Sequence, residues 1–440
     1  MKGEISLGVV CLARKTFDYK EAKNIYDNAK KDLAELENVH IHAIDDLVIE
    51  IDDCKKALDE LRPYKLDGVV IISGTFHLGH LALMIEKVYK NLPILLWAFN
   101  ELPYNGGKIR LNSVCGVNLN ASNLYKAGYT NAVCRIGDTI DENWVDAVRM
   151  RAALDNSHVG IIGSSAQGFF NVSTDLLKLF SEYGVLVDNY QISSLFEYQP
   201  TEEEIEKELL EVGSAFNCHF VTKKQTRQVA SLVVSTEHFL KENSLDAIAI
   251  RCWPEFAKIY GISPCAMMSV LQTKGYILGC EGDIEATLSM LACKTLGCEA
   301  PFLADLSQVN LEKNFALMWH CGVAPYTLWD NKSVCSLDSY FAGGKGVTAD
   351  FVLKSGECSF LRIDTALGET RVFTIHGKAV PMEKLIKGTY AKVVFDNDIG
   401  DVLDVVTSTG IAHHVVMIYG DYMKTFEEFA KIMKWTPITA

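Results

Sequence analysis

The stretch Ile5-Ser-Leu-Gly-Val-Val-Cys-Leu12 decides the fold class, because it has the pattern of a buried strand and a helix-length segment follows it directly. This alternation of short apolar runs with amphipathic helical stretches is typical of parallel sheets flanked by helices. It starts again at a second strand, Val159 to Gly163. The sequence therefore predicts two successive open α/β domains, Rossmann-like and with parallel sheets. The further strands we expect are residues 39–43, 68–73, 94–98, 185–189 and 247–250.

The pattern changes at about residue 335, where short alternating segments are separated by glycine-containing turns. This texture predicts a small antiparallel, β-barrel-like domain at the C-terminal end. We expect domain boundaries that give an N-terminal α/β domain at 1–156, a central α/β domain at 157–334 and a β domain at 335–440.

Charge and cysteine content exclude several function classes. The 42 Lys and Arg residues against 56 Asp and Glu residues give a net charge of -14, the wrong sign for binding nucleic acid or an anionic membrane. The 13 cysteines contain no Cys-x-x-Cys pair, which disfavours a disulfide framework and a thiolate zinc site. The apolar stretch Ile5 to Ala13 is too short for a membrane span and has charged flanks, so we expect a cytoplasmic protein without a secretory signal.

Two local motifs have both a functional and a plain structural interpretation. Gly160-Ile-Ile-Gly-Ser-Ser-Ala-Gln-Gly168 resembles a phosphate-binding loop, but Phe169 and Phe170 stand where Lys and Ser/Thr are needed, which favours a tight strand-to-helix turn. The missing Gly-x-Gly-x-x-Gly pattern also disfavours a nicotinamide-dependent dehydrogenase. His77 and His80 are spaced for one helical face and are either metal ligands or ordinary histidines.

Two carboxylates mark the most informative region. Glu281 and Asp305 each stand where an apolar run ends, and a helix-length segment separates them. Because the carboxyl ends of parallel strands line the ligand crevice of an α/β sheet, both side chains are expected to meet there. A divalent metal would keep both carboxylates ionised, and His320 or the pair His413-His414 would add imidazole ligands. The alternative is a set of surface acids and helix caps.

An ordered set of motifs resembles the L-fucose isomerase and L-arabinose isomerase superfamily, and within it the fucose-isomerase-like members. The similarity is clearest over residues 250–325 and returns at 410–415. The motifs are Cys252-Trp-Pro-Glu-Phe256, Tyr260-Gly-Ile-Ser-Pro-Cys265, Cys280-Glu-Gly-Asp283, Leu303-Ala-Asp305, His320 and the late His413-His414.

The resemblance implies a metal-dependent aldose–ketose isomerase acting through an enediolate proton shuttle. Glu281 and Asp305 take the positions of the family's acid/base pair, which also bind a divalent ion, usually Mn²⁺. His414 takes the place of the third ligand, with His413 as the alternative one residue away. His320 corresponds to a fourth ligand that the arabinose-type members use.

The resemblance also implies partners and substrates. We expect a homo-oligomer, a hexamer in this family, with active sites at subunit interfaces. Arg14, Trp253 and His413 are the candidate substrate-binding residues. The expected substrate is an aldose such as L-fucose or D-arabinose. The alternative is sulfoquinovose, whose sulfonate needs a basic contact such as Arg14, Lys15 or Arg251. A non-catalytic sugar-binding module is the alternative from another class.

Overall fold

The computed structural model describes residues 1–341 and 345–440, which form two compact units. The N-terminal unit comprises residues 2–152 together with 424–435, and the C-terminal unit comprises 153–423 with both chain ends. Within the described part of the chain, no helix combines the length and the hydrophobicity that a membrane span requires.

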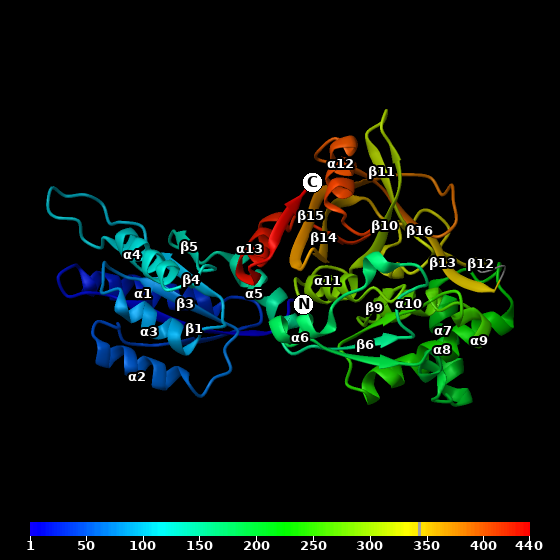
Figure 1. The fold of residues 1–440 in the computed structure, drawn as a ribbon, viewed down its shortest axis with the longest axis horizontal. Helices are drawn as coiled ribbons and strands as arrows, with labels where there is room; N and C mark the ends of the chain where they lie inside the picture. Colours follow the sequence, from blue (N-terminus) through cyan, green and yellow to red (C-terminus); the bar gives the residue numbers. More distant parts are fainter. Residues whose placement is uncertain (342–344) are drawn as a thin grey trace. The chain divides into compact units, whose positions relative to one another are not determined.

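The N-terminal unit is an open α/β layer. Its five strands are all parallel in the order β2-β1-β3-β4-β5, a doubly wound order with a switch point between β1 and β3. Helices cover this sheet (Figure 1). This confirms the first predicted α/β domain. The elements are β1 (Ile5–Leu12), α1 (Tyr19–Ala34), β2 (Val39–Ala43), α2 (Ile51–Leu61), β3 (Gly68–Ser73), α3 (His80–Val88), β4 (Ile94–Ala98), α4 (Ser113–Lys126), β5 (Val133–Ile136), α5 (Glu142–Leu154) and α13 (Met423–Met433).

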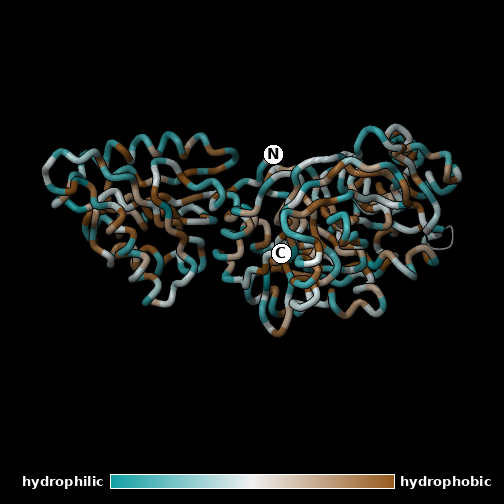
Figure 2. The backbone as a smooth tube through the Cα atoms, turned by 90° about the horizontal axis from the view of Figure 1, so that it is seen from above, coloured by the Kyte–Doolittle hydropathy of each residue, from teal (hydrophilic) through white to brown (hydrophobic). Residues whose placement is uncertain are grey.

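Burial explains why these segments are strands. Every residue of β3 and β4 is buried, and both strands are rich in Val, Ile and Leu. Such runs are typical of parallel strands that helices cover on both faces. In Figure 2 the hydrophobic stretches lie largely inside each unit and the hydrophilic ones largely on its outside.

The C-terminal unit contains a second parallel sheet, in the order β7-β6-β8-β9. This confirms the second predicted α/β domain. Its elements are β6 (His158–Ile162), η1 (Phe170–Val172), α6 (Leu176–Tyr183), β7 (Leu186–Tyr190), η2 (Ile192–Phe196), α7 (Glu202–Ala215), α8 (Lys223–Glu242), β8 (Ala247–Ile250), α9 (Phe256–Ile259), α10 (Cys265–Thr273), β9 (Ile277–Cys280) and α11 (Ile284–Lys294).

The same unit contains a nine-stranded mixed sheet in the order β12-β13-β16-β11-β10-β17-β14-β15-β18. An additional pairing of β15 with β16 closes six antiparallel strands into a ring, which confirms the predicted barrel-like β structure. The elements are β10 (Phe302–Asn310), β11 (Phe315–His320), η3 (Tyr326–Leu328), β12 (Ser336–Phe341), β13 (Gly346–Val352), β14 (Gly356–Ala366), β15 (Glu369–Val380), β16 (Thr389–Phe395), α12 (Ile399–Thr409), β17 (His414–Tyr419) and β18 (Thr436–Thr439).

The barrel includes β10 and β11, which lie before residue 334 in the sequence. The domain boundaries after residues 156 and 334 stay predictions. Helix α11 connects the two sheets of the C-terminal unit. Residues Ile284 to Cys293 are all buried, and the helix packs on β8 and β9 of the parallel sheet and on β14 and β17 of the barrel (Figure 1). A helix that is buried all round belongs in the interior of a large domain.

Candidate functional site

The turn between β9 and α11 presents Glu281 at the end of a parallel strand. Glu281 and Gly282 both have left-handed backbone conformations, with φ of 61° and 72°. A Cβ at Gly282 would collide with the backbone of Ser164, so only glycine fits this close approach. Asp283 then caps α11, because its carboxylate accepts the backbone N–H of Ala286.

The barrel register brings Asp305 and His414 together. They are directly opposite each other in the antiparallel pairing of β10 with β17. His414 Nε2 lies 3.4 Å from Asp305 Oδ1 and 3.0 Å from Glu281 Oε2. One imidazole nitrogen therefore faces two carboxylates that are 24 residues apart in the sequence, as expected. Glu281 follows the parallel strand β9, but Asp305 lies within the antiparallel barrel strand β10 (Phe302–Asn310), so the expectation that Asp305 ends a strand of the parallel sheet is wrong.

A fully buried chain of charges orients His414. Its Nδ1 lies 2.9 Å from Asp283 Oδ2, and Arg362 Nη1 donates to the same carboxylate oxygen at 2.8 Å. The side chains of all three residues are completely buried. Because Nδ1–H donates to Asp283, the lone pair of the neutral imidazole is on Nε2, on the side of Glu281 and Asp305.

The electrostatics of the site favour ionised carboxylates. Burial raises the pKa of Glu281, but the neighbouring imidazoles of His413 and His414 outweigh burial and hold this pKa well below its usual range. Burial lowers the pKa of His414, yet Asp283 and Glu281 together raise it above its ordinary value. The negative charge of the cluster therefore attracts a cation to Nε2, either a proton or a metal ion.

Buried polar atoms without a partner test whether a metal ion fits. Asp305 Oδ1, His414 Nε2 and His320 Nε2 are buried and make no hydrogen bond within residues 1–341 and 345–440. Ligand atoms of Asp305, His320 and His414 lie within 4.8 Å of one another, and so do those of Glu281, His413 and His414. Carboxylate oxygens with imidazole nitrogens suit a divalent ion such as Mn²⁺ or Zn²⁺, so the residues fit the expected metal.

His320 differs from His414 in its tautomer. It is the last residue of β11, and its Nδ1 accepts the backbone N–H of Cys321 at 2.9 Å. In the neutral imidazole the hydrogen is then on Nε2, the nitrogen that has no hydrogen-bond partner among the described residues. This geometry favours a hydrogen-bond donor at His320 over a metal ligand.

Aromatic side chains flank Glu281. Trp253 Nε1–H donates to Glu281 Oε1 at 2.8 Å. Phe169 makes edge-to-face contacts with both Trp253 and His413, with ring centroids 5.7 and 5.2 Å apart. His413 Nε2 lies 3.8 Å from Glu281 Oε2, and its side chain is 38% exposed. Of the two adjacent histidines, His414 is thus the interior one and His413 the accessible one.

The structure brings the predicted residues Glu281, Asp305, His320, His414, His413 and Trp253 into one cluster. Arg14 belongs to the N-terminal unit, where its backbone N–H donates to Thr75 Oγ1. In that unit His77 is buried and bonds to Ser73 Oγ at 2.9 Å, while His80 is exposed. Among the described residues, neither of these two histidines belongs to a group with metal-binding geometry.

Sequence reasoning missed the residues that support the cluster. Asp283 was part of a quoted motif, and its position before a helix gave a sign only of a cap. Arg362 lies in the mostly buried strand β14, and a charged residue in a buried strand is a sign of a buried ion pair. Phe169 was noted only as the residue that breaks a phosphate-loop pattern.

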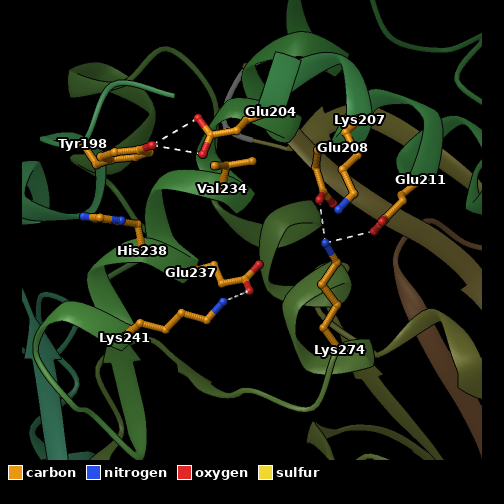
Figure 3. A pocket seen from close by; sticks show the side chains of 10 residues that line it. All are labelled: Tyr198, Glu204, Lys207, Glu208, Glu211, Val234, Glu237, His238, Lys241 and Lys274. Carbon is orange, nitrogen blue, oxygen red and sulfur yellow. Dashed lines mark hydrogen bonds and ion pairs between the residues drawn. The ribbon is translucent and has the colours of Figure 1, made fainter. Parts of the chain in front are cut away.

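A pocket of about 500 Å³ lies between α7 and α8 (Figure 3). It is lined by Glu and Lys side chains that pair with one another. Lys274 Nζ lies 2.5 Å from Glu208 Oε2 and 3.0 Å from Glu211 Oε2, and Lys241 pairs with Glu237. None of the predicted site residues lines this pocket. The converging carboxylates and imidazoles are therefore the better candidate site.

Comparisons with known proteins found similarity to sugar isomerases. Residues 8–141 match the model of the fucose/sulfoquinovose isomerase family, N-terminal domain. A sulfoquinovose isomerase of Priestia megaterium is 28% identical over 442 residues, which cover 96% of each chain. That of Alkalicoccus urumqiensis is 26% identical, again over 96% of each chain. A sugar-binding protein of Actinobacillus succinogenes aligns with a TM-score of 0.17 and 12% identity over 58% of this chain and 82% of its own, too low to show a shared fold.

Proposed function

Because the chain belongs to the fucose and sulfoquinovose isomerase family and is an isomerase acting on a sugar, we propose that it converts sulfoquinovose to the corresponding ketose. Sulfoquinovose is a glucose that carries a sulfonate on C6. Of the sugars expected from the sequence, L-fucose and D-arabinose were favoured, with sulfoquinovose as the alternative. The names of relatives that align over nearly the whole chain support the alternative.

The proposed metal ligands are Glu281, Asp305 and His414. The observation that carries the proposal is the convergence of Glu281 Oε2 and Asp305 Oδ1 on His414 Nε2, within 3.4 Å, in a buried setting with unpartnered ligand atoms. A divalent ion bound there, Mn²⁺ by resemblance to the family, would act as a Lewis acid toward the two neighbouring sugar oxygens. His320 is proposed to donate its Nε2–H to a sugar oxygen.

Glu281 and Asp305 are also the proposed proton-transfer pair. Moving a carbonyl from C1 to C2 requires removal of the C2 proton, return of a proton to C1 and transfer of the hydroxyl proton from O2 to O1, through an enediolate of the sugar. The low pKa of Glu281 keeps it ionised as an acceptor at neutral pH. Trp253 donates to Glu281 Oε1, which orients this carboxylate and leaves Oε2 on the reacting side. Trp253 and His413 are proposed to contact the sugar.

The test is NMR of the manganese-loaded protein in deuterated water with sulfoquinovose, L-fucose, D-arabinose and D-glucose. We expect ketose formation from sulfoquinovose, loss of turnover with a chelator and deuterium on the reacting carbon. Faster conversion of L-fucose or D-arabinose would overturn the substrate assignment. Binding of sugar without turnover of any of the four would favour the non-catalytic module instead.

We further propose that the enzyme is cytoplasmic and works as a homo-oligomer, a hexamer, in which Arg14 of a neighbouring subunit reaches the sugar. Support comes from the family resemblance and from the position of Arg14 directly after β1, at the carboxyl edge of a parallel sheet. Light scattering coupled to gel filtration gives the mass of the assembly. A monomer that is fully active would exclude a contribution of Arg14 from a neighbour.

A further inference from the structure

The glycine-rich turn that follows β6 touches the metal-ligand turn directly. It comprises residues 163–168, and its Gly163 and Ser164 have left-handed φ values of 82° and 79°. The backbone N–H of Ala166 donates to the carbonyl oxygen of Glu281 at 2.9 Å. Strands β6, β8 and β9 are parallel neighbours, so this turn, Arg251 and Glu281 follow their carboxyl ends along one edge of the sheet.

This turn has free hydrogen-bond donors. Within the described residues, the backbone N–H groups of Ser164 and Ser165 donate to no protein atom. The side chain of Ser164 is exposed, and that of Ser165 is partly exposed. The Ser164 hydroxyl donates to the Ser165 carbonyl oxygen at 3.4 Å, so the free donors of the turn are its backbone N–H groups. Free N–H groups at the end of a parallel strand are a typical setting for an anion. The turn lacks the lysine that a nucleotide phosphate loop requires, which points to a smaller anionic group.

Arg251 supplies the positive charge at the same edge. Its Nη1 donates to Ser164 Oγ at 3.2 Å and its Nη2 to Glu255 Oε1 at 2.8 Å. Among the described residues, the Nε–H of Arg251 is buried without a hydrogen-bond partner, and so is Glu255 Oε2. The side chain is 19% exposed, so part of the guanidinium is accessible while one donor is unused. An arginine held in this way presents directed N–H groups in a rigid fork.

We propose that Arg251, Ser164 and Ser165, the sulfonate subsite, bind the anionic group on C6 of the sugar. This inference rests on the proposed function and adds the residues that select its substrate. The sulfonate has three acceptor oxygens, which match the guanidinium, the free backbone N–H groups and the Ser165 hydroxyl, while the Ser164 hydroxyl can turn from the Ser165 carbonyl oxygen toward the sulfonate. C6 lies at the opposite end of the sugar from C1 and C2, so the subsite and the carboxylates hold the two ends of one molecule.

Glu255 makes the subsite selective for a single negative charge. The Arg251–Glu255 pair is neutral as a whole, so binding relies on directed hydrogen bonds more than on net charge. A sulfonate carries one negative charge, whereas a sugar phosphate carries close to two at neutral pH. The Glu255 carboxylate repels the second charge, which separates sulfoquinovose from glucose 6-phosphate, a sugar with a doubly charged group on C6.

The experiment compares Arg251→Gln with a matched control, Lys258→Gln, which removes an exposed positive charge from the neighbouring helix α9. We expect Arg251→Gln to lower kcat/KM for sulfoquinovose about 10- to 100-fold, mainly through KM, because charge-assisted hydrogen bonds are lost. Activity on D-glucose should change less than about two-fold, and Lys258→Gln should alter neither. An equal loss on both sugars, or no loss on sulfoquinovose, overturns the subsite.

Two further measurements separate failure of the subsite from failure of the proposed function. If the wild type converts no sugar, calorimetric binding of sulfoquinovose still reports on the subsite: weaker binding by Arg251→Gln supports it, and equal binding overturns it. Glucose 6-phosphate binding as tightly as sulfoquinovose contradicts the selectivity assigned to Glu255. If Arg251→Gln does not fold, Ser164→Ala replaces it, with an expected loss of about three- to ten-fold on sulfoquinovose only.

Discussion

His77 in the N-terminal unit and His414 in the C-terminal unit are both completely buried, yet their surroundings are opposite. His77 Nε2 has neutral partners, Ser73 Oγ at 2.9 Å and Asn120 Nδ2 at 3.3 Å, and burial lowers its pKa to about 4. His414 has carboxylates on both ring nitrogens, and its pKa is raised.

The difference shows what distinguishes a ligand site from a satisfied interior histidine. Burial is the same in both, so burial alone gives no sign of function. At His77 every ring nitrogen has a hydrogen-bond partner, whereas Nε2 of His414 and Oδ1 of Asp305 lack one. Buried polar groups are ordinarily satisfied, so the orphaned atoms indicate a group that the protein binds.

The largest effect is expected at Glu281. Glu281→Gln removes a ligand charge and the proton acceptor together, and kcat/KM should fall at least about 1,000-fold. The measurement is ketose formation followed by NMR, and the assembly should stay intact by gel filtration. Glu312→Gln, an exposed glutamate in the β10–β11 turn, is the control and should keep full activity. Near-wild-type turnover by Glu281→Gln would remove the basis of the site assignment.

Substitution of Asp283, whose carboxylate binds Nδ1 of His414, should have the next largest effect. Asp283→Asn removes the acceptor that holds the His414 tautomer, and the affinity for Mn²⁺ should fall about 10- to 100-fold. Asp364→Asn is the matched control. It removes another carboxylate that accepts a hydrogen bond from Arg362, but the partner of His414 Nδ1 is Asp283 and stays in place. Calorimetric metal titration compares the two variants. Equal metal affinities would show that Asp283 serves only the stability of the barrel.

The neutral state of His77 predicts a pH dependence of stability. The ordinary histidine pKa is 6.5 and that of folded His77 is about 4, so the unfolded state binds more protons between these values. The contribution of neutral His77 to the free energy of unfolding is complete above pH 6.5 and is lost as the pH falls toward 4. The free energy of unfolding should fall by about 2 kcal/mol between pH 7 and pH 5 for this reason. Urea unfolding of wild type and His77→Gln measures it. Parallel pH profiles of the two proteins would contradict the prediction.

The smallest effect is expected at His320. If its Nε2–H is a donor, His320→Gln keeps a donor near the same place and metal affinity should change less than about three-fold, while kcat falls modestly. Metal titration and steady-state kinetics separate these quantities. A loss of metal affinity of 100-fold or more would make His320 a fourth ligand, as in the arabinose-type members.

Much of this arrangement follows from local sequence, and the rest depends on pairing between distant strands. Glu281 was predictable because it follows an apolar run at a strand end, whereas Asp305 follows such a run but lies inside the antiparallel strand β10. The choice between His413 and His414 was not, because only the register of β17 against β10 places His414 opposite Asp305. Arg362 is the clearest miss, since its partner Asp283 is 79 residues away and no local pattern links them.

Helix α11 has a consequence for how the site behaves over time. Because residues 284–293 are buried between the parallel sheet and the barrel, the amides of this helix can meet solvent only when the two sheets separate. Hydrogen exchange of the α11 amides should therefore track global unfolding. The helix follows the Glu281 turn at its N-terminal end and precedes the Asp305 strand, β10, at its C-terminal end. The Glu281 and Asp305 carboxylates thus keep their places between turnovers, and the proposed metal ion would bind to ligands that are already in position, without a folding step.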